Sequence, residues 1–156
     1  MNVEDVQKRV SQIGSIVGWL QSIEFLLRWW LARCGGHDIA LPKHIGQMLE
    51  STPITDYRSL GQLVSAYNGK LSAEEASYRL DPQIVEIRDA HAHGRSLAID
   101  GENFLILYRF SRPRDGKVTT IGMKALTPEV LEAEMDLLRD QWNLLHACGT
   151  KRGYFH

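Results

Sequence analysis

The first 33 residues carry an apolar stripe that is typical of one long helix. Its members recur at spacings of three and four, which places them on one helical face: Val3, Val6, Val10, Ile13, Val17, Leu20, Ile23, Leu27 and Trp30. At 1.5 Å per residue the helix is roughly 45 Å long, so we expect it to pack against several elements or a second subunit. Cys34-Gly35-Gly36 predicts its end, because glycine favours the left-handed C-cap.

Three shorter helical segments are predicted next from their start and stop signals. A short helix is expected at Pro42–Glu50. Another is expected from a cap at Thr55 or Asp56 to the stop at Asn68-Gly69. Ser72-Ala73-Glu74-Glu75 has the form of a capping box and opens a further turn or two.

Two helices with clear N-terminal signals complete the helical pattern. Asp81-Pro82 opens a helix that runs to His93, with aspartate as the cap and proline in the first turn. Thr127-Pro128 caps the last helix, which we expect to close at Cys148-Gly149. The inner face of this last helix repeats at spacings of four and three through Leu131, Met135, Leu138, Trp142 and Leu145.

The pattern changes period between these two helices. Phe104–Phe110 and Val118–Met123 are dense apolar runs typical of strands, and Pro113-Arg114-Asp115-Gly116 between them carries an Asp-Gly hairpin signal. The sequence therefore predicts a mainly α fold, a helical bundle with one β-hairpin inserted around residues 103–124. We expect residues 1–156 to form a single domain.

Composition limits the class of protein further. The chain has 156 residues, 44% of them hydrophobic, and 18 basic residues oppose 19 acidic ones for a net charge of −1. This balance excludes a histone-like polycation and an acidic disordered tail. Residues 13–31 are apolar but are interrupted by Glu24 and Arg28, so they do not predict a membrane helix. With only Cys34 and Cys148 there is no disulfide framework, and we expect a cytoplasmic protein with reduced thiols.

One segment concentrates the side chains that carry chemistry. Arg88, Asp89, His91, His93 and Arg95 lie within eight residues, at the end of a predicted helix. A histidine titrates near neutral pH and moves a proton in either direction. The planar guanidinium of an arginine matches a phosphate bidentately. Together they suit the cleavage of a phosphodiester bond, and this chemistry requires no metal.

This segment resembles the HEPN domains (higher eukaryotes and prokaryotes nucleotide-binding). Arg88, four intervening residues and His93 fit the Arg-x4–6-His signature of that family. Asp89 follows the arginine, where members often carry Asn, Asp or His, and Ala92-His93-Gly94-Arg95 is similar to bacterial members. The layout is also similar, with a long helix before the motif and a hairpin and C-terminal helix after it.

The resemblance implies a helical bundle that dimerises with the motif near the two-fold axis. Many members are metal-independent endoribonucleases, often toxins or phage-defence effectors, and others are non-catalytic. On this analogy Arg88 holds the scissile phosphate and His93 is the general acid or base, while Asp89 orients the histidine or a partner-chain group. His91 and Arg95 are auxiliary candidates. The family implies RNA or a nucleotide as ligand, an antitoxin protein as a possible partner, and no cofactor.

Helical geometry separates the two central residues of the motif. Arg88 and His93 lie roughly 140° apart on an ideal helix, whereas Asp89 and His93 share a face, as do Arg88 and His91. Either the last turn unwinds at Gly94 or two chains assemble the site. The second option agrees with the dimeric site of the family, so we predict a homodimer.

Several candidates also have an ordinary structural interpretation. Cations near a helix C-terminus complement the helix dipole, which alone would account for the arginines and histidines of the motif. Glu24 either pairs with Arg88 or points to solvent. Trp29-Trp30, with Trp19 earlier on the helix, favours a subunit interface over a platform for stacked bases.

The predicted hairpin adds weaker candidates for nucleic-acid contact. Arg109, Arg112 and Arg114 either bind RNA phosphates or are ordinary charges at a solvated hairpin tip. No metal site is predicted, because Cys34, His37, His44 and Cys148 lack zinc-finger spacing. The His91-Ala92-His93 pair is similar to metal-binding strands of hydrolase barrels, but a barrel needs roughly 250 residues.

Three functions are therefore open at this stage. The first is a HEPN-like homodimer that cuts RNA without a metal. The second is a non-catalytic module that binds a nucleotide, RNA or protein. The third is a structural dimerisation domain in which the motif only strengthens the interface.

Overall fold

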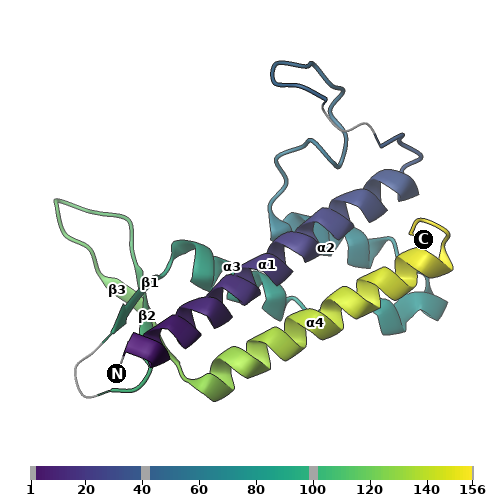
Figure 1. Cartoon of the computed structure of the whole chain (residues 1–156). Coiled ribbons are helices and arrows are strands. Elements are labelled where there is room, and N and C mark those ends of the chain that lie inside the picture. Colours follow the sequence, from purple (N-terminus) through teal and green to yellow (C-terminus); the bar gives the residue numbers. More distant parts are fainter. Residues whose placement is uncertain (1–2, 40–42, 99–101, 156) are drawn as a thin grey trace. The chain divides into compact units, whose positions relative to one another are not determined.

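A computed structural model describes residues 3–39, 43–98 and 102–155 of the chain (Figure 1). The fold is mainly helical, as predicted, with a small antiparallel sheet. In chain order the elements are α1 (Val3–Cys34), α2 (Leu60–Gly69), the 3-10 helix η1 (Ala73–Tyr78), α3 (Gln83–His93), β1 (Arg95–Ala98), β2 (Leu105–Phe110), β3 (Thr120–Leu126) and α4 (Pro128–Lys151). None of the helices in the described ranges is both long and apolar enough to span a membrane.

The elements fall into two compact units, and each unit combines distant parts of the sequence. Unit 1 contains Met1–Leu20 and Gln83–Arg139, and unit 2 contains Gln21–Pro82 and Asp140–His156. Unit 1 therefore holds the first part of α1, all of α3, the sheet and the first part of α4. In both units, α1 and α4 each supply part of the core.

The apolar stripe of α1 is only partly buried. Its second half is buried as predicted, but Val3, Val10 and Val17 are 74%, 58% and 38% exposed, and Ile16 is fully buried instead. The prediction was wrong for the first half for a geometric reason. A stripe spaced at three and four repeats every 3.5 residues and drifts about 20° per heptad around a helix of 3.6 residues per turn.

Trp30 belongs to the core of unit 2. Its side chain is fully buried, and its ring lies 4.7 Å from that of Tyr67 and 5.7 Å from that of Tyr154, centroid to centroid. The guanidinium of Arg152 lies 4.8 Å from the same ring. The expectation that Trp30 forms a subunit interface or a stacking platform is therefore wrong, because its own unit encloses it.

Two helix predictions in unit 2 also fail. Residues 43–46 form a bend and a turn and residues 47–50 have no regular structure. Gly46 adopts φ +85°, which breaks helical geometry, and Pro42 lies outside the described residues. Helix α2 is capped by Ser59, which forms a capping box with Gln62. Asp56 does not cap it, because its carboxylate accepts hydrogen bonds from Arg28 and Arg58.

Other local signals are confirmed. Ser72 and Glu75 form the predicted capping box at the start of η1, with the Ser72 amide donating to the Glu75 carboxylate over 3.0 Å. Helix α4 passes the expected stop and ends at Lys151. Gly149 lies within the helix, and the ring of Phe155 packs against it, only 2.2 Å from where a Cβ would lie.

The sheet has three strands in the order β1-β2-β3, all antiparallel. The predicted hairpin is confirmed as β2 and β3. Its turn places Asp115 at φ +50° and Gly116 at φ +72°, and Arg114 and Lys117 exchange backbone hydrogen bonds of 2.9 Å, as the Asp-Gly signal requires. Strand β1 was not predicted. It is four residues long and exposed along its length, so it carries no apolar period.

Candidate functional site

The motif residues lie at the end of α3, where glycine joins the helix to the sheet. The Gly94 amide donates to the Ala90 carbonyl oxygen over 2.8 Å and closes the last turn. A Cβ at Gly94 would lie 2.4 Å from that oxygen and 2.5 Å from Cδ1 of Leu107 on β2. Only glycine allows this approach. His93 is therefore the last residue of α3, and Arg95 is the first residue of β1.

Arg88 and Asp89 form a partly exposed ion pair. Nη1 of Arg88 donates to Oδ1 of Asp89 over 2.8 Å, and the two side chains are 34% and 41% exposed. The structure thus gives Asp89 an arginine partner. A pair at this level of exposure is worth little stability, so an anion with two acceptor oxygens is able to compete with Asp89 for the guanidinium.

His91 is buried and bound to a carboxylate on another element. Its side chain is 2% exposed, and Nε2 lies 2.8 Å from Oε2 of Glu134 on α4, which is 6% exposed. Lys124 on β3 donates from Nζ to the other oxygen of Glu134. One oxygen of Glu134 therefore binds the ammonium group of Lys124 on the sheet, and the other binds the His91 ring of α3.

The Glu134 carboxylate is charged in this arrangement. Burial alone would raise its pKa, but the hydrogen bonds from His91 and Lys124 outweigh that effect and hold the pKa below its ordinary value. An ionised carboxylate is only an acceptor, so Nε2 of His91 carries the hydrogen of this bond. The bond fixes the orientation of the His91 ring and, with it, the rotation of the last turn of α3.

His93 faces the other way. Residues two apart on a helix lie about 200° apart around the axis, so the burial of His91 directs His93 outward. His93 is exposed and has no hydrogen-bond partner in the described ranges. His93 is thus the histidine of the motif that solvent reaches, whereas the side chain of His91 is buried against Glu134.

The remaining candidates are distributed over both units. Arg109, Arg112 and Arg114 are exposed on β2 and the hairpin of unit 1. Glu24 belongs to unit 2, where Oε1 accepts from Nη2 of Arg28 over 2.9 Å. The structure therefore gives Glu24 a local partner one turn along α1.

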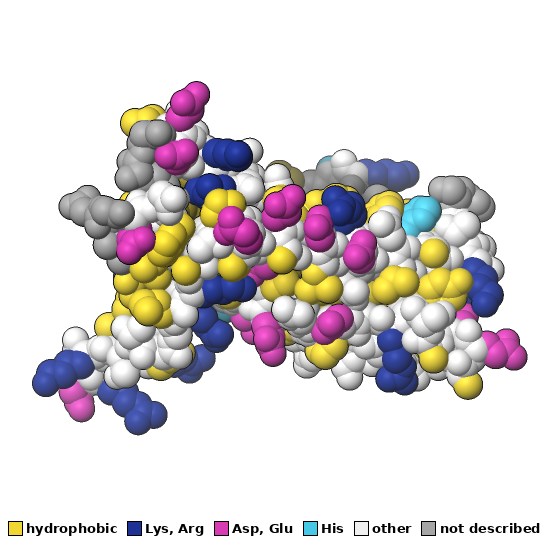
Figure 2. Space-filling model, turned by 90° about the horizontal axis from the view of Figure 1, so that it is seen from below, with side chains coloured by type: hydrophobic (Ala, Val, Ile, Leu, Met, Phe, Trp, Pro, Cys, Tyr) yellow, Lys and Arg dark blue, Asp and Glu magenta, His cyan; other side chains and the backbone are white. Residues whose placement is uncertain are grey.

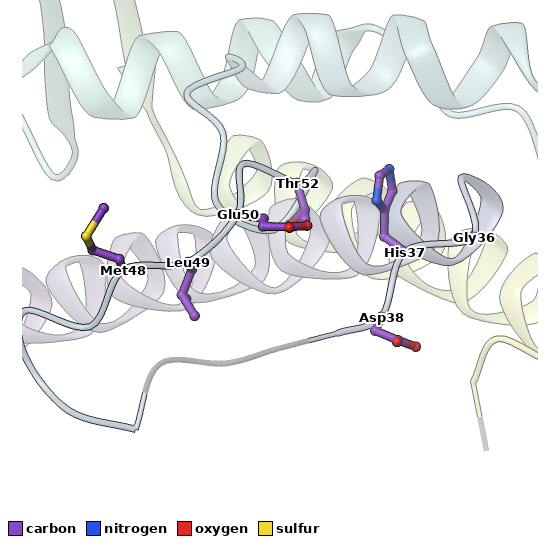
Figure 3. Close-up of a pocket in the computed structure, with 7 residues that line it drawn as sticks. All are labelled: Gly36, His37, Asp38, Met48, Leu49, Glu50 and Thr52. Carbon is purple, nitrogen blue, oxygen red and sulfur yellow. The ribbon is translucent and has the colours of Figure 1, made fainter.

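Each of the two units contains a surface hollow. In unit 1 a hollow of about 220 Å³ between α3 and the hairpin strands is lined by nine residues, with Glu86, Arg109 and Lys124 as its charged members. In unit 2 a hollow of about 500 Å³ is lined by the seven residues labelled in Figure 3. Its His37 and Asp38 side chains point to opposite sides of their segment, and none of the predicted site residues lines it (Figure 3).

Sequence reasoning missed Glu134 and Lys124 as partners of the motif. On α4, Glu134 lies three residues after Leu131 and four before Leu138, both fully buried. An acid on an apolar stripe is a signal for a buried, paired carboxylate. No group of three His, Cys, Asp or Glu side chains within the described ranges is placed to hold a metal ion.

The chain matches no known protein-family model, and comparison with curated proteins and with solved structures finds no match. The resemblance to HEPN domains therefore remains a prediction from the motif and the layout.

Proposed function

We propose that this chain is a HEPN-like endoribonuclease that cuts RNA phosphodiester bonds without a metal ion, through Arg88 and His93. The observation that supports it best is the different environment of the two motif histidines. His91 is bound to Glu134, while His93 is exposed at the end of the same helix. A proton carrier has to reach its substrate, and His93 satisfies this condition.

Arg88 supplies the phosphate contact in this proposal. Its side chain is partly exposed and bound to one carboxylate oxygen of Asp89. The guanidinium carries five donors, so a phosphate is able to take two of them in the bidentate geometry. The charge of Arg88 then stabilises the extra negative charge that develops on the phosphate oxygens during cleavage.

Cleavage needs one group that accepts a proton and one that donates a proton. The 2′-hydroxyl of the RNA attacks phosphorus and loses its proton to a base, while the departing 5′-oxygen receives a proton from an acid. The products are a 2′,3′-cyclic phosphate and a 5′-hydroxyl. One chain offers a single exposed motif histidine, so two chains facing each other supply both groups, which is our reason for proposing a homodimer.

The experiment is a cleavage assay on a labelled, structured RNA in EDTA. The wild type is compared with Arg88→Ala, Arg88→Lys and His93→Ala, and Arg139→Ala on the exposed face of α4 is the control. We expect fragments with cyclic-phosphate ends from the wild type and the control, a loss of at least 100-fold in both alanine variants, and partial activity in Arg88→Lys.

Intact RNA in every lane would overturn the proposal and leave the non-catalytic binding module as the alternative. Equal cleavage by all variants would assign the activity to another site or to a contaminant. Light scattering at the assay concentration tests the dimer separately, since a strict monomer with full activity would contradict a site built from two chains.

A further inference from the structure

The sheet of unit 1 has one face turned toward α3 and one exposed face. Leu107 on β2 approaches Gly94 and so marks the inner face. Side chains alternate along a strand and register partners share a face, so Tyr108, with its partners Arg95 and Met123, belongs to the outer face. Met123 is 68% exposed there.

Two aromatic rings and a cation are held together on this outer face. The rings of Tyr108 and Phe110 lie 6.2 Å apart, centroid to centroid, at an interplanar angle of 17°. The guanidinium carbon of Arg95 lies 5.6 Å from the Phe110 centroid. Arg95 has no carboxylate partner in the part of the chain that the structure describes. We call Arg95, Tyr108 and Phe110 the aromatic platform.

The charges around the platform have one dominant sign. Of the three cations on the strands, Arg95 lies on the outer face, whereas Arg109 and Lys124 share the inner face with Leu107. The strands carry no acidic residue. The loop between β2 and β3 adds Arg112, Arg114 and Lys117 against Asp115 alone. Exposed acids of unit 1 include Glu102 before β2, Glu86 on α3, and Glu129, Glu132 and Asp136 on α4. Figure 2 shows acidic side chains (magenta) over the helical part of the face that it draws. A polyanion is therefore attracted to Arg95 and to the hairpin loop.

We propose that the aromatic platform binds unpaired bases of single-stranded RNA. Bases stack on aromatic rings with little dependence on their identity, and cations beside the rings hold the phosphate backbone. A base paired within a duplex cannot offer its face to a ring that stands on a sheet, so the ligand is single-stranded. The choice of RNA over DNA rests on the proposed function, whereas the platform itself rests on the rings and charges.

A second copy of this chain is the less favoured occupant. Two copies joined through the same face by a two-fold axis would bring their Arg95 side chains and hairpin cations toward each other, and like charges across an interface oppose association. Nucleic acid has the opposite charge and satisfies the same cations.

The test is binding of a fluorescein-labelled 12-nucleotide oligouridine in EDTA, followed by anisotropy. An Arg88→Ala/His93→Ala background keeps the RNA intact. We expect Tyr108→Ala or Phe110→Ala to weaken binding roughly 5- to 150-fold, the range for losing one stacked base. Tyr108→Phe and Phe110→Tyr retain the ring and should bind within about twofold of the parent. Val10→Ala removes an exposed aliphatic side chain on α1, outside the sheet, and is the matched control.

Three outcomes would overturn the inference. The first is undetectable oligouridine binding, and the second is unchanged binding in both alanine variants while circular dichroism shows that they fold. The third is that the alanine variants lose dimerisation and lose RNA binding only to the extent that the dimer is lost. This result would make the face a subunit interface. If the wild type cleaves RNA and the platform substitutions leave that cleavage unchanged, this inference alone is rejected. Ring-dependent binding without any cleavage rejects the proposed ribonuclease and keeps the platform.

Discussion

Nε2 of His91 lies 2.8 Å from Oε2 of Glu134, and the two side chains are only 2% and 6% exposed. This bond joins the motif helix to α4 within unit 1. It also gives the two histidines of the motif different environments, with His91 inside the unit and His93 at its surface. Substitutions of Glu134 should therefore act through stability and through the orientation of α3.

Glu134→Gln should destabilise the protein at pH 7 by about 2 kcal/mol, because it leaves Lys124 and His91 without their shared negative charge. The pKa of Glu134 is lower in the folded chain than its ordinary value of 4.5. Its stabilisation is therefore complete above about pH 4.5 and is lost as the pH falls through the folded pKa. Urea unfolding at pH 7 and pH 3 should show a difference between wild type and variant that shrinks in acid. A difference that stays constant would contradict the charged carboxylate.

Gly94→Ala should lower the free energy of unfolding by about 1–3 kcal/mol, since its Cβ would collide with Ala90 and Leu107. Gly14→Ala is a suitable comparison, because its Cβ would meet nothing within 4 Å in the middle of α1. It should raise stability by about 0.5–1 kcal/mol through helix propensity alone. Thermal unfolding of both variants measures these opposite signs, and a neutral Gly94→Ala would disprove the tight junction.

Asp89→Asn should leave stability within about 0.5 kcal/mol of the wild type, because its ion pair is partly exposed. It should strengthen RNA binding about two- to fivefold, since Arg88 no longer shares its charge with a carboxylate. Anisotropy in EDTA on the His93→Ala background measures the affinity. The same substitution combined with Arg88→Ala is the control and should show no gain; a gain there would mean that Asp89 acts independently of Arg88.

RNA binding should depend strongly on salt. For a single strand the plot of log K against log salt has a slope of about −0.7 per phosphate contact. Arg112→Gln together with Arg114→Gln should therefore make the slope less steep by about 1.4 if each arginine meets one phosphate. Arg139→Gln removes an exposed cation on α4 that pairs with Asp136 and should leave the slope unchanged. Equal slopes for all proteins would remove the hairpin from the RNA interface.

Features encoded by neighbouring residues were predictable from the sequence. The Ser72–Glu75 capping box and the Asp115-Gly116 turn each depend on a few consecutive positions, and the mainly helical class follows from the apolar periods. Strand β1 was not predictable in this way. It is short and exposed, and its pairing with β2 is what defines it.

The candidate site shows the same limit. The motif from Arg88 to His93 was visible as a pattern, but the pattern does not say which histidine is buried. That depends on Glu134, more than 40 residues later, and on Lys124 in the sheet. Likewise, the grouping of Arg95 with Phe110 requires the register of β1 on β2, for which the sequence carries no local signal.

A single residue, Gly94, separates His93 from Arg95. Their Cα atoms are consequently at most about 7 Å apart, close to the length of one nucleotide of extended backbone. If both proposals hold, a base on the platform and a phosphate at His93 belong to the same short stretch of one strand. Scissions would then occur at a constant small offset from an unpaired base. The position of cleavage would depend on this spacing along the RNA and not on the identity of the bases.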